Sequence, residues 1–327
     1  MSWHPETRMP TLFEKSQSDP EWLSIYDHPD RLARRTIDVD GYRTGYIEAG
    51  SKDAPPLVLI HGGNFQVGAA SDRWYPTILP LSKFFRVIAV DELGGGATDP
   101  PRDLRDIGDV TVRARHVQAF LEKMNLGPAH LVGQSQGAWI AAYIALRRSD
   151  LVRKLVLVDS ASLALPEGGM GGAYIAKNFA NSFLPGTMVN DSLRATPESV
   201  RSYFGSMVYD QSMLSDALVQ RLVTLAEKWL PIWDKPWRDF WSDGGERNRR
   251  QYIVDGVHLG ASIDKLPEHP LVIWGKNSVK GIENGLDFYK RIPDAQFHVF
   301  DRANHFLWLD QWKGFNSLVA WYLLQSD

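Results

Sequence analysis

The stretch Gly133–Gly137 (GQSQG) has the residue types of a nucleophilic site, because it follows the pattern G-x-S-x-G. In this pattern the serine lies on a sharp turn between a strand and a helix, and the glycines let neighbouring segments approach closely. A serine hydroxyl is a weak nucleophile until a base removes its proton, and a histidine can take and return that proton near neutral pH.

The segments beside Ser135 predict the strand and the helix that this turn requires. The apolar run Ala129–Val132 precedes the serine, and the helix-forming run Ala138–Leu146 follows it. The N-terminus of that helix would present free N–H groups to the serine, where they can stabilise negative charge. We therefore expect Ser135 at a nucleophile elbow.

Short apolar runs alternate with helical patterns along most of the chain, which predicts an α/β fold with a doubly wound, mostly parallel sheet. Helices are predicted near Trp74–Leu81 and Val112–Met124. The predicted strands besides the one before Ser135 are Thr36–Val39, Tyr42–Glu48, Leu57–Ile60, Phe85–Val90, Lys154–Asp159, Pro270–Gly275 and Ala295–Phe300.

The strand alternation is absent between about residues 163 and 265, which divides the chain. We expect an N-terminal extension at residues 1–35, an α/β core at residues 36–162 and 266–327, and a helical lid at residues 163–265. Four lid tryptophans have four-residue spacing, and aromatic rings more often pack than bind a substrate. Pro231 and Pro236 argue against one unbroken helix through them. The tryptophans are Trp229, Trp233, Trp237 and Trp241.

Composition narrows the class of protein. The 327 residues carry a net charge of −3 with both signs interspersed, which predicts neither a nucleic-acid nor a membrane partner. The sequence has no apolar run of about 18 residues and no export signal at its start, so we expect a cytoplasmic protein. It has no cysteine, no histidine cluster with metal spacing and no phosphate-loop lysine, so we predict no metal and no other cofactor. The expected partner is a small-molecule substrate, and a homo-oligomer stays open.

Three motifs in chain order resemble the α/β-hydrolase superfamily: the HGG loop (His61–Gly63), the serine stretch and Ala303–Phe306 (ANHF). The resemblance covers the chain apart from its N-terminal extension. It implies that Ser135 is the nucleophile and His305 the general base. It also implies an oxyanion hole formed by the backbone N–H groups of Gly63 and Gln136, with His61 bracing the loop.

Further stretches are similar to meta-cleavage product hydrolases, which hydrolyse a C–C bond in vinylogous 1,5-diketones derived from aromatic ring cleavage. These stretches are Thr196–Val200, Met207–Ser212, Ile292–Phe300 and Phe315–Asn316. The similarity implies a substrate pocket beside the elbow. The residues expected to line it are Gly62, Asn64, Phe65, Gln134, Trp139, Arg221 and Phe306.

The family's triad aspartate is missing, because Ser278 stands at its position. A serine cannot supply the negative charge that holds the imidazole in its reactive tautomer. The best replacement is Asp159, which follows the strand after the elbow helix and could alternatively be a structural carboxylate. The weaker replacements are Glu283, Asp287 and Asp301.

Two further positions depart from the family pattern. Asn64–Gln66 follow HGG where the family has more glycine and a proline, which changes the pocket beside the oxyanion hole. Leu222 stands where the family's lid arginine binds the substrate carboxylate, and Arg221 lies one residue earlier. One residue turns a helix by about 100°, so Arg221 need not face the pocket and a carboxylated dienoate loses support.

These residues favour a serine hydrolase with a relocated or missing acid. Its substrate would be a small, largely apolar, aromatic compound, cleaved at an ester, lactone, amide or C–C bond next to a carbonyl. One alternative is a cofactor-independent lyase in which His305 is the base and Ser135 only donates a hydrogen bond. The other is a binding protein with a decayed triad, since fold does not fix function.

Overall fold

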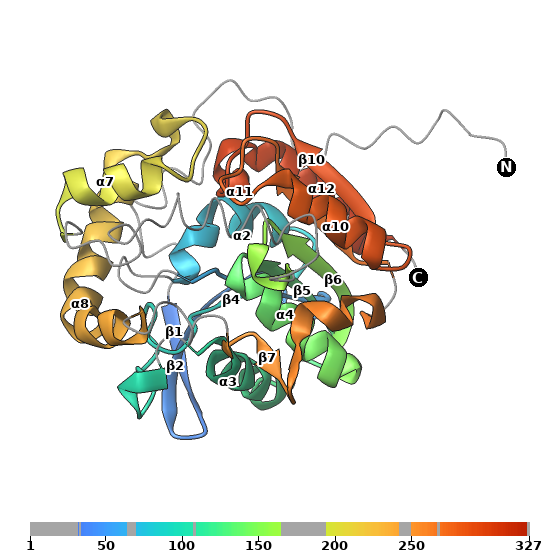
Figure 1. The fold of residues 1–327 in the computed structure, drawn as a ribbon, viewed down its shortest axis with the longest axis horizontal. Coiled ribbons are helices and arrows are strands. Elements are labelled where there is room, and N and C mark those ends of the chain that lie inside the picture. Colours follow the sequence, from blue (N-terminus) through green and yellow to red (C-terminus); the bar gives the residue numbers. More distant parts are fainter. Residues whose placement is uncertain are drawn as a thin grey trace, which may run out of the picture.

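An eight-stranded sheet runs through the computed structural model, which describes residue 32 and residues 34–63, 70–106, 109–164, 194–241, 250–266 and 269–325 (Figure 1). The strand order is β1-β2-β4-β3-β5-β6-β9-β10. The six strands β4, β3, β5, β6, β9 and β10 pair in parallel, whereas β1 and β2 form an antiparallel edge. The predicted fold class is therefore confirmed. The strands are β1 (Arg34–Val39), β2 (Tyr42–Ala49), β3 (Pro56–Ile60), β4 (Arg86–Val90), β5 (Ala129–Gln134), β6 (Val152–Val158), β9 (Leu271–Gly275) and β10 (Gln296–Phe300).

The strands are continuously apolar because both faces of the sheet are buried. In β3, Leu57 and Leu59 belong to one core cluster and Val58 and Ile60 to the other, as the two-residue period of a strand requires. Residues of α2, α11 and α12 complete the first cluster, and residues of α3, α4 and α10 complete the second. These helices are α2 (Tyr75–Leu81), α3 (Val110–Lys123), α4 (Gln136–Arg147), α10 (Ile282–Arg291), α11 (Leu307–Asp310) and α12 (Trp312–Leu324).

The parallel arrangement gathers loops that are distant in the sequence. The carboxyl ends of parallel strands lie at one edge of a sheet, which is where sites form in open α/β folds. His61 follows β3, Glu92 follows β4 and Asp159 follows β6 at this edge. Ser135 follows β5 there, so the chain order already places its polar residues together.

The stretch predicted as an extension contributes to the sheet at its end. Arg34 and Arg35, the last two residues of that stretch, lie in β1. Residues 1–31 and 33 lie outside the described residues. Arg34 is held by ion pairs with Asp72 at 2.6 Å and Asp91 at 3.1 Å. The predicted strand began two residues later, at Thr36. Arg34 and Arg35 are charged, so the apolar pattern did not include them.

The described part of residues 163–265 contains a nine-residue helix, a 26-residue helix and a small hairpin that was not predicted. The prediction of a break at Pro231 and Pro236 is wrong, because both prolines lie inside α8. Tertiary packing of the helix face outweighs the backbone hydrogen bonds that two prolines remove. The domain boundaries stay predictions. The elements are α7 (Pro197–Gly205), η8 (Gln211–Met213), α8 (Asp216–Trp241), β7 (Ile253–Val254), β8 (Val257–His258) and η9 (Leu259–Lys265).

Two of the lid tryptophans attach α8 to the loop after β4. The indole N–H of Trp229 donates to the carbonyl of Gly96 at 3.2 Å, and that of Trp233 donates to the carbonyl of Gly94 at 2.9 Å. The two rings stack with their centroids 5.8 Å apart, and both are buried. These two tryptophans therefore pack α8 on the core, as the commoner role of such rings predicts. The side chains of Trp237 and Trp241 lie outside the described residues.

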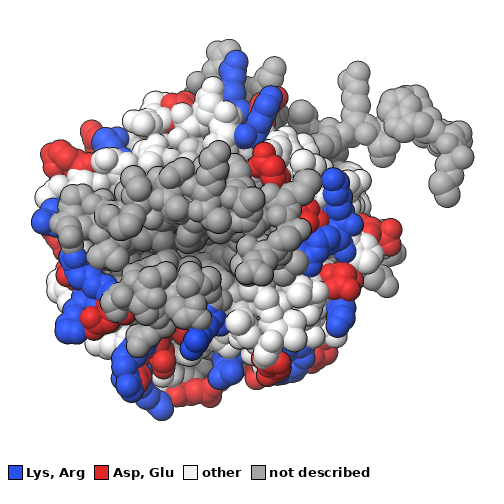
Figure 2. All heavy atoms as spheres, viewed as in Figure 1, with Lys and Arg blue, Asp and Glu red and all other residues white. Residues whose placement is uncertain are grey.

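The outer surface agrees with the mixed charge of the sequence. Lys and Arg residues interleave with Asp and Glu residues around the described part of the face in Figure 2. Among the helices that the structure describes, none has the length and apolar composition needed to cross a bilayer.

We predict that Gly94→Ala destabilises the fold by roughly 2 kcal/mol more than Gly256→Ala does. Both glycines have positive φ, +74° and +79°, so both substitutions strain the backbone. An added Cβ at Gly94 would lie 1.8 Å from the Trp233 ring, whereas one at Gly256 would have no atom within 4 Å. Urea unfolding of the two variants measures the difference. Equal losses of unfolding free energy would show that α8 does not depend on this contact.

Candidate active site

Ser135 lies on a strained turn between β5 and α4, with φ 55° and ψ −122°. Its backbone N–H donates to the carbonyl of Val158 at 2.9 Å, which fixes the turn to the neighbouring strand β6. A Cβ at Gly133 would lie 2.2 Å from the Gly137 carbonyl, and one at Gly137 would lie 2.3 Å from the Ile60 carbonyl. Only glycine fits both positions, so the predicted strand–turn–helix is present for the reason that the sequence suggested.

His305 lies in the loop between β10 and α11, next to the carboxyl end of β6. Its Nδ1 is 2.8 Å from Oδ1 of Asp159, and both side chains are buried. The other predicted acids lie elsewhere in the described structure: Asp301 pairs with Lys276 and Asp287 with Arg291. Of the candidate carboxylates, Asp159 is the one that the fold brings to the histidine.

Ser278 contacts the same carboxylate. Its hydroxyl donates to Oδ1 of Asp159 at 2.6 Å, while the backbone N–H of Gly275 donates to Oδ2 at 3.0 Å. The residue at the family's acid position therefore supports Asp159 with a hydrogen bond. Nothing in the local sequence indicates this contact, since Asp159 and Ser278 come from the ends of adjacent strands, β6 and β9.

The protonation of His305 follows from its surroundings. Burial lowers the pKa of His305 below its ordinary value, although the hydrogen bond and charge of Asp159 oppose that shift. Neutral imidazole that donates from Nδ1 to Asp159 has an accepting Nε2. The side-chain amide of Gln134 lies 2.9 Å from that Nε2 and donates to it. Among the described residues, Gln134 rather than Ser135 occupies the nitrogen that would accept a proton.

The HGG loop lies directly over the elbow. A Cβ at Gly62 would be 2.8 Å from Cβ of Ser135, and one at Gly63 would be 2.1 Å from Oε1 of Gln136. His61 is buried, and its Nε2 accepts from the N–H of Glu92 at 3.1 Å. Its Nδ1 therefore carries the proton and donates to the Gly62 carbonyl at 2.9 Å. Burial also lowers the pKa of His61, which keeps the ring neutral as a brace.

A buried ion pair that sequence reasoning missed holds the side chain of Gln136. Arg113 contacts Oε2 of Glu92 at 2.6 Å and donates to Oε1 of Gln136 at 2.9 Å. The amide nitrogen of Gln136 donates to the Tyr252 hydroxyl at 3.0 Å. The residue whose backbone N–H is the predicted oxyanion donor is thus fixed from both ends of its amide. The members of this network are far apart in sequence, so no local pattern indicates it.

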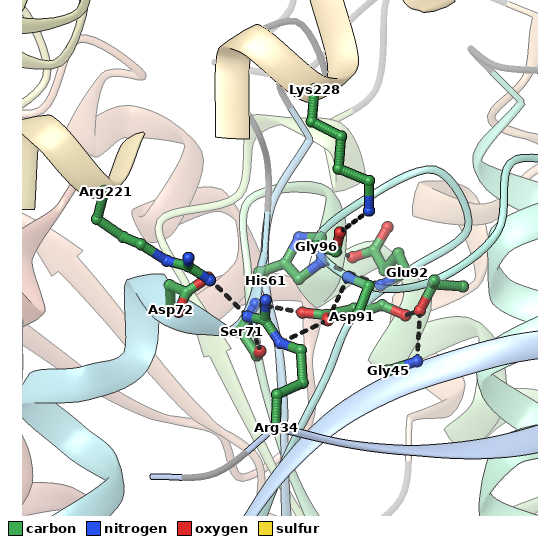
Figure 3. Close-up of polar contacts among 12 residues, drawn as sticks. Arg34, Gly45, His61, Ser71, Asp72, Asp91, Glu92, Gly96, Arg221 and Lys228 are labelled. Carbon is green, nitrogen blue, oxygen red and sulfur yellow. Dashed lines mark hydrogen bonds and ion pairs between the residues drawn. The ribbon is translucent and has the colours of Figure 1, made fainter. Parts of the chain in front are cut away.

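Arg221 points to a network of charged residues that was not predicted. Its guanidinium lies 3.3 Å from Oδ2 of Asp72, a carboxylate that Arg34 also contacts (Figure 3). Nearby on α8, Lys228 donates to the Gly96 carbonyl at 2.7 Å. Arg221 thus pairs with a buried carboxylate, and its place in the substrate pocket stays a prediction. Burial would raise the pKa of Asp72, but Arg34 and Arg221 together lower it to about 2.

A small apolar pocket lies between helices α7, α8 and α11. Phe306, which was predicted to line a pocket, does so together with Phe204 of α7 and Leu222 of α8. Arg73 is the charged residue among the described lining residues, and the sequence analysis missed it. Trp139 instead packs in the core, where its ring stacks on Tyr143 at 5.6 Å. The predicted pocket residues Asn64 and Phe65 lie outside the described residues.

Comparisons with known proteins identify the family of the chain. Residues 55–311 match the family model described as the alpha/beta hydrolase fold. The chain is 28% identical to 2-hydroxymuconate semialdehyde hydrolase of Pseudomonas sp. strain CF600, over 90% of this chain and 94% of that protein. It is 25% identical to 2-hydroxy-6-oxo-6-phenylhexa-2,4-dienoate hydrolase of Burkholderia cepacia, over 87% and 92%.

A solved structure of a meta-cleavage product hydrolase from Pseudomonas fluorescens IP01 superposes with a TM-score of 0.71 at 26% identity, covering 89% of this chain and 97% of that one. The resemblance seen in the sequence is confirmed by these relatives. The family model matches most of the chain, a serine follows β5 in the elbow turn, and a histidine follows the last strand. The chain therefore belongs to the α/β-hydrolase fold family and is a hydrolase.

Proposed function

We propose that Ser135, His305 and Asp159 are the nucleophile, base and acid of this hydrolase. The observation that carries the proposal is the 2.8 Å contact between Nδ1 of His305 and Oδ1 of Asp159, beside a strained serine turn. A buried carboxylate in that position selects the tautomer in which Nε2 can accept a proton. Asp159 accepts from Ser278 as well, which supports its ionised form as hydrogen-bond acceptor.

The substrate we propose is a small, largely apolar aromatic compound with a carbonyl next to the cleaved bond. Relatives named for the hydrolysis of 2-hydroxymuconate semialdehyde and of 2-hydroxy-6-oxo-6-phenylhexa-2,4-dienoate support a C–C bond among the ester, lactone, amide and C–C bonds that such a site can cleave. The apolar side chains that line the small pocket beside Phe306 support a substrate with little polar surface. We retain a cytoplasmic location and a small-molecule partner as part of this proposal.

The reaction would begin when the Gln134 amide releases Nε2 of His305 to the Ser135 hydroxyl. Nε2 then takes the serine proton as Oγ attacks the carbonyl carbon, and Asp159 stabilises the imidazolium that forms. The backbone N–H groups of Gly63 and Gln136 would donate to the oxyanion, in positions held by His61 and Arg113. His305 returns the proton to the leaving group, and water releases the acyl group from Ser135 by the same steps.

The contact between Gln134 and His305 also favours a second candidate function. If Nε2 stays with Gln134, His305 cannot activate Ser135, and the site would suit a cofactor-independent lyase in which the serine only donates a hydrogen bond. The two candidates differ in whether Ser135 forms a covalent bond.

We predict that a fluorophosphonate probe labels Ser135 covalently, because the probe reacts with a serine that an adjacent base activates. Mass spectrometry of the digested protein would locate the label, and Ser135→Ala is expected to abolish it. A folded wild-type protein that remains unlabelled would reject the serine-hydrolase proposal and leave the lyase candidate.

Asp159→Asn should lower kcat on 4-nitrophenyl butyrate by about 10³- to 10⁴-fold, since asparagine cannot stabilise the imidazolium and favours the wrong tautomer. The matched control is Asp287→Asn, because Asp287 pairs with Arg291 on α10 instead. Thermal unfolding of both variants separates catalysis from stability. A folded Asp159→Asn variant with near wild-type turnover would remove Asp159 from the mechanism.

The pH profile should lose kcat/KM on the acid side at a pH below 6.5, the ordinary pKa of histidine. Only neutral His305 accepts the serine proton, so activity falls as pH drops through its pKa, and burial lowers that pKa. The measurement is kcat/KM from about pH 4.5 to 8, with circular dichroism to show that the protein stays folded. An acid limb centred above pH 6.5 would contradict this assignment.

A further inference from the structure

Arg73 carries a buried positive charge that the catalytic proposal does not use. The residue is 6% exposed, and it lies in the segment η3 (Ser71–Trp74) that follows the HGG loop. Resting on the proposed function and extending it, we propose that Arg73 binds an anionic group of the substrate, a carboxylate or similar oxyanion, within the apolar pocket. The site would thus take an apolar acid rather than a neutral compound.

The hydrogen bonds of Arg73 leave one buried edge of its guanidinium without a partner. Nη1 donates to the Gly63 carbonyl at 3.1 Å, while Nε and Nη2 have no hydrogen-bond partner in the described structure. Nε–H and one Nη2–H lie on the same side of the planar group. This edge is the one that grips a carboxylate through two parallel hydrogen bonds.

The charge of Arg73 has no acid of its own among the described residues. The Tyr203 phenol and the Glu92 carboxylate act on its charge, and that carboxylate is already paired with Arg113 at 2.6 Å. The rings of Phe204 and Phe306 lie 5.4 Å and 5.6 Å from the guanidinium carbon and offer only cation–π stabilisation. Burial lowers the pKa of Arg73 to about 10, so the group stays charged near neutral pH. A buried, unpaired cation is costly, and a ligand anion would remove that cost.

The other residues that line the pocket are apolar and therefore favour an apolar body for the ligand. Leu218 and Leu222 of α8 and Trp308 of α11 line it together with the two phenylalanines, so the anionic group would sit at the end of an apolar body. The Phe306 ring lies 5.5 Å from the ring of His305, which places the pocket beside the proposed base. The anion and the reacting carbonyl would therefore belong to one short molecule.

Arg73 also connects the anion to the oxyanion loop. Its Nη1 holds the carbonyl of Gly63, and the N–H of Gly63 is a proposed oxyanion donor. An anion on the opposite edge would fix the guanidinium and, through Nη1, the orientation of that peptide. Loss of the arginine should therefore raise KM for an anionic substrate and lower its kcat as well.

The test compares two esters of similar length, neutral 4-nitrophenyl butyrate and anionic mono-4-nitrophenyl glutarate. We expect wild-type protein to prefer the anionic ester, and Arg73→Gln to reduce kcat/KM for that ester about 10-fold or more beyond its effect on the neutral one. Arg73→Lys keeps the charge without the planar edge and should give an intermediate loss. The control Arg105→Gln removes an exposed arginine that pairs with Asp103 and should change neither value.

Two outcomes would overturn the inference. Equal losses on both esters would show that Arg73 only supports the Gly63 loop, and unchanged preference would show that no anion contacts it. Because Arg73→Gln removes an unpaired buried charge and keeps an amide that can donate to the Gly63 carbonyl, the variant should unfold near the wild-type temperature. A large drop in that temperature would mean that the guanidinium serves the fold, and Arg73→Lys would then supply the kinetic comparison.

A binding measurement separates this inference from the proposed function. If wild-type protein hydrolyses neither ester and resists the fluorophosphonate probe, the serine mechanism fails while the anion site is still testable. Calorimetric titration with phenylacetate should then show binding to wild-type protein and about 10-fold or more weaker binding to Arg73→Gln. Equal affinity, or no binding to either protein, would reject the anion site.

Discussion

The close approach of two backbones at the elbow constrains the position of every other group in the site. Gly137 lies against the Ile60 carbonyl, and the N–H of Ser135 donates to Val158 across the adjacent strand. The serine turn is therefore locked to β3 on one side and to β6 on the other. The HGG loop continues from β3 and Asp159 follows β6, so both begin from backbone that the elbow already holds. The strain at Ser135 persists because this packing over-determines it.

The second constraint is the burial of charge at the carboxyl edge of the sheet. Asp159 is surrounded by donors from His305, Ser278 and Gly275, and Glu92 by Arg113. Charged groups this deep are tolerated when they are paired or well hydrogen-bonded. Arg73 stands apart, since only Nη1 has a protein acceptor. Arg73 therefore keeps two buried donors, Nε and Nη2, without a protein acceptor, and the proposed ligand anion would satisfy both.

The sequence predicted the features that depend on local pattern and missed those that depend on distant pairing. The strands, the elbow and the position of His305 follow from apolar periodicity and glycine spacing, which are local properties. Asp159 could be proposed because it ends a strand next to the elbow strand. In contrast, Arg113, Arg73 and Arg34 resemble any surface arginine in sequence, because burial of a charge has no local signature.

In helix α8, tertiary packing overrides a prediction made from local sequence. A local rule about proline predicted a break in α8 that packing overrides, since Trp229 and Trp233 fix the helix to the glycine loop. The contact of Arg221 with Asp72 was likewise not predicted, because it joins residues that are far apart in the chain. Helix rotation and long-range charge pairing decide such cases, and neither can be read from one stretch of sequence.

The pairing of β6 with β9 has a consequence for how such sites change over evolutionary time. Asp159 and Ser278 follow neighbouring parallel strands. The Ser278 hydroxyl donates to Oδ1 of Asp159, the same oxygen that contacts Nδ1 of His305. Under the proposed mechanism, a carboxylate at either strand end can serve a histidine that does not move. An ancestor could exchange the two positions by two substitutions, with the hydroxyl left behind as a donor to the new acid. Searches that require an aspartate at the older position would pass over descendants of this kind.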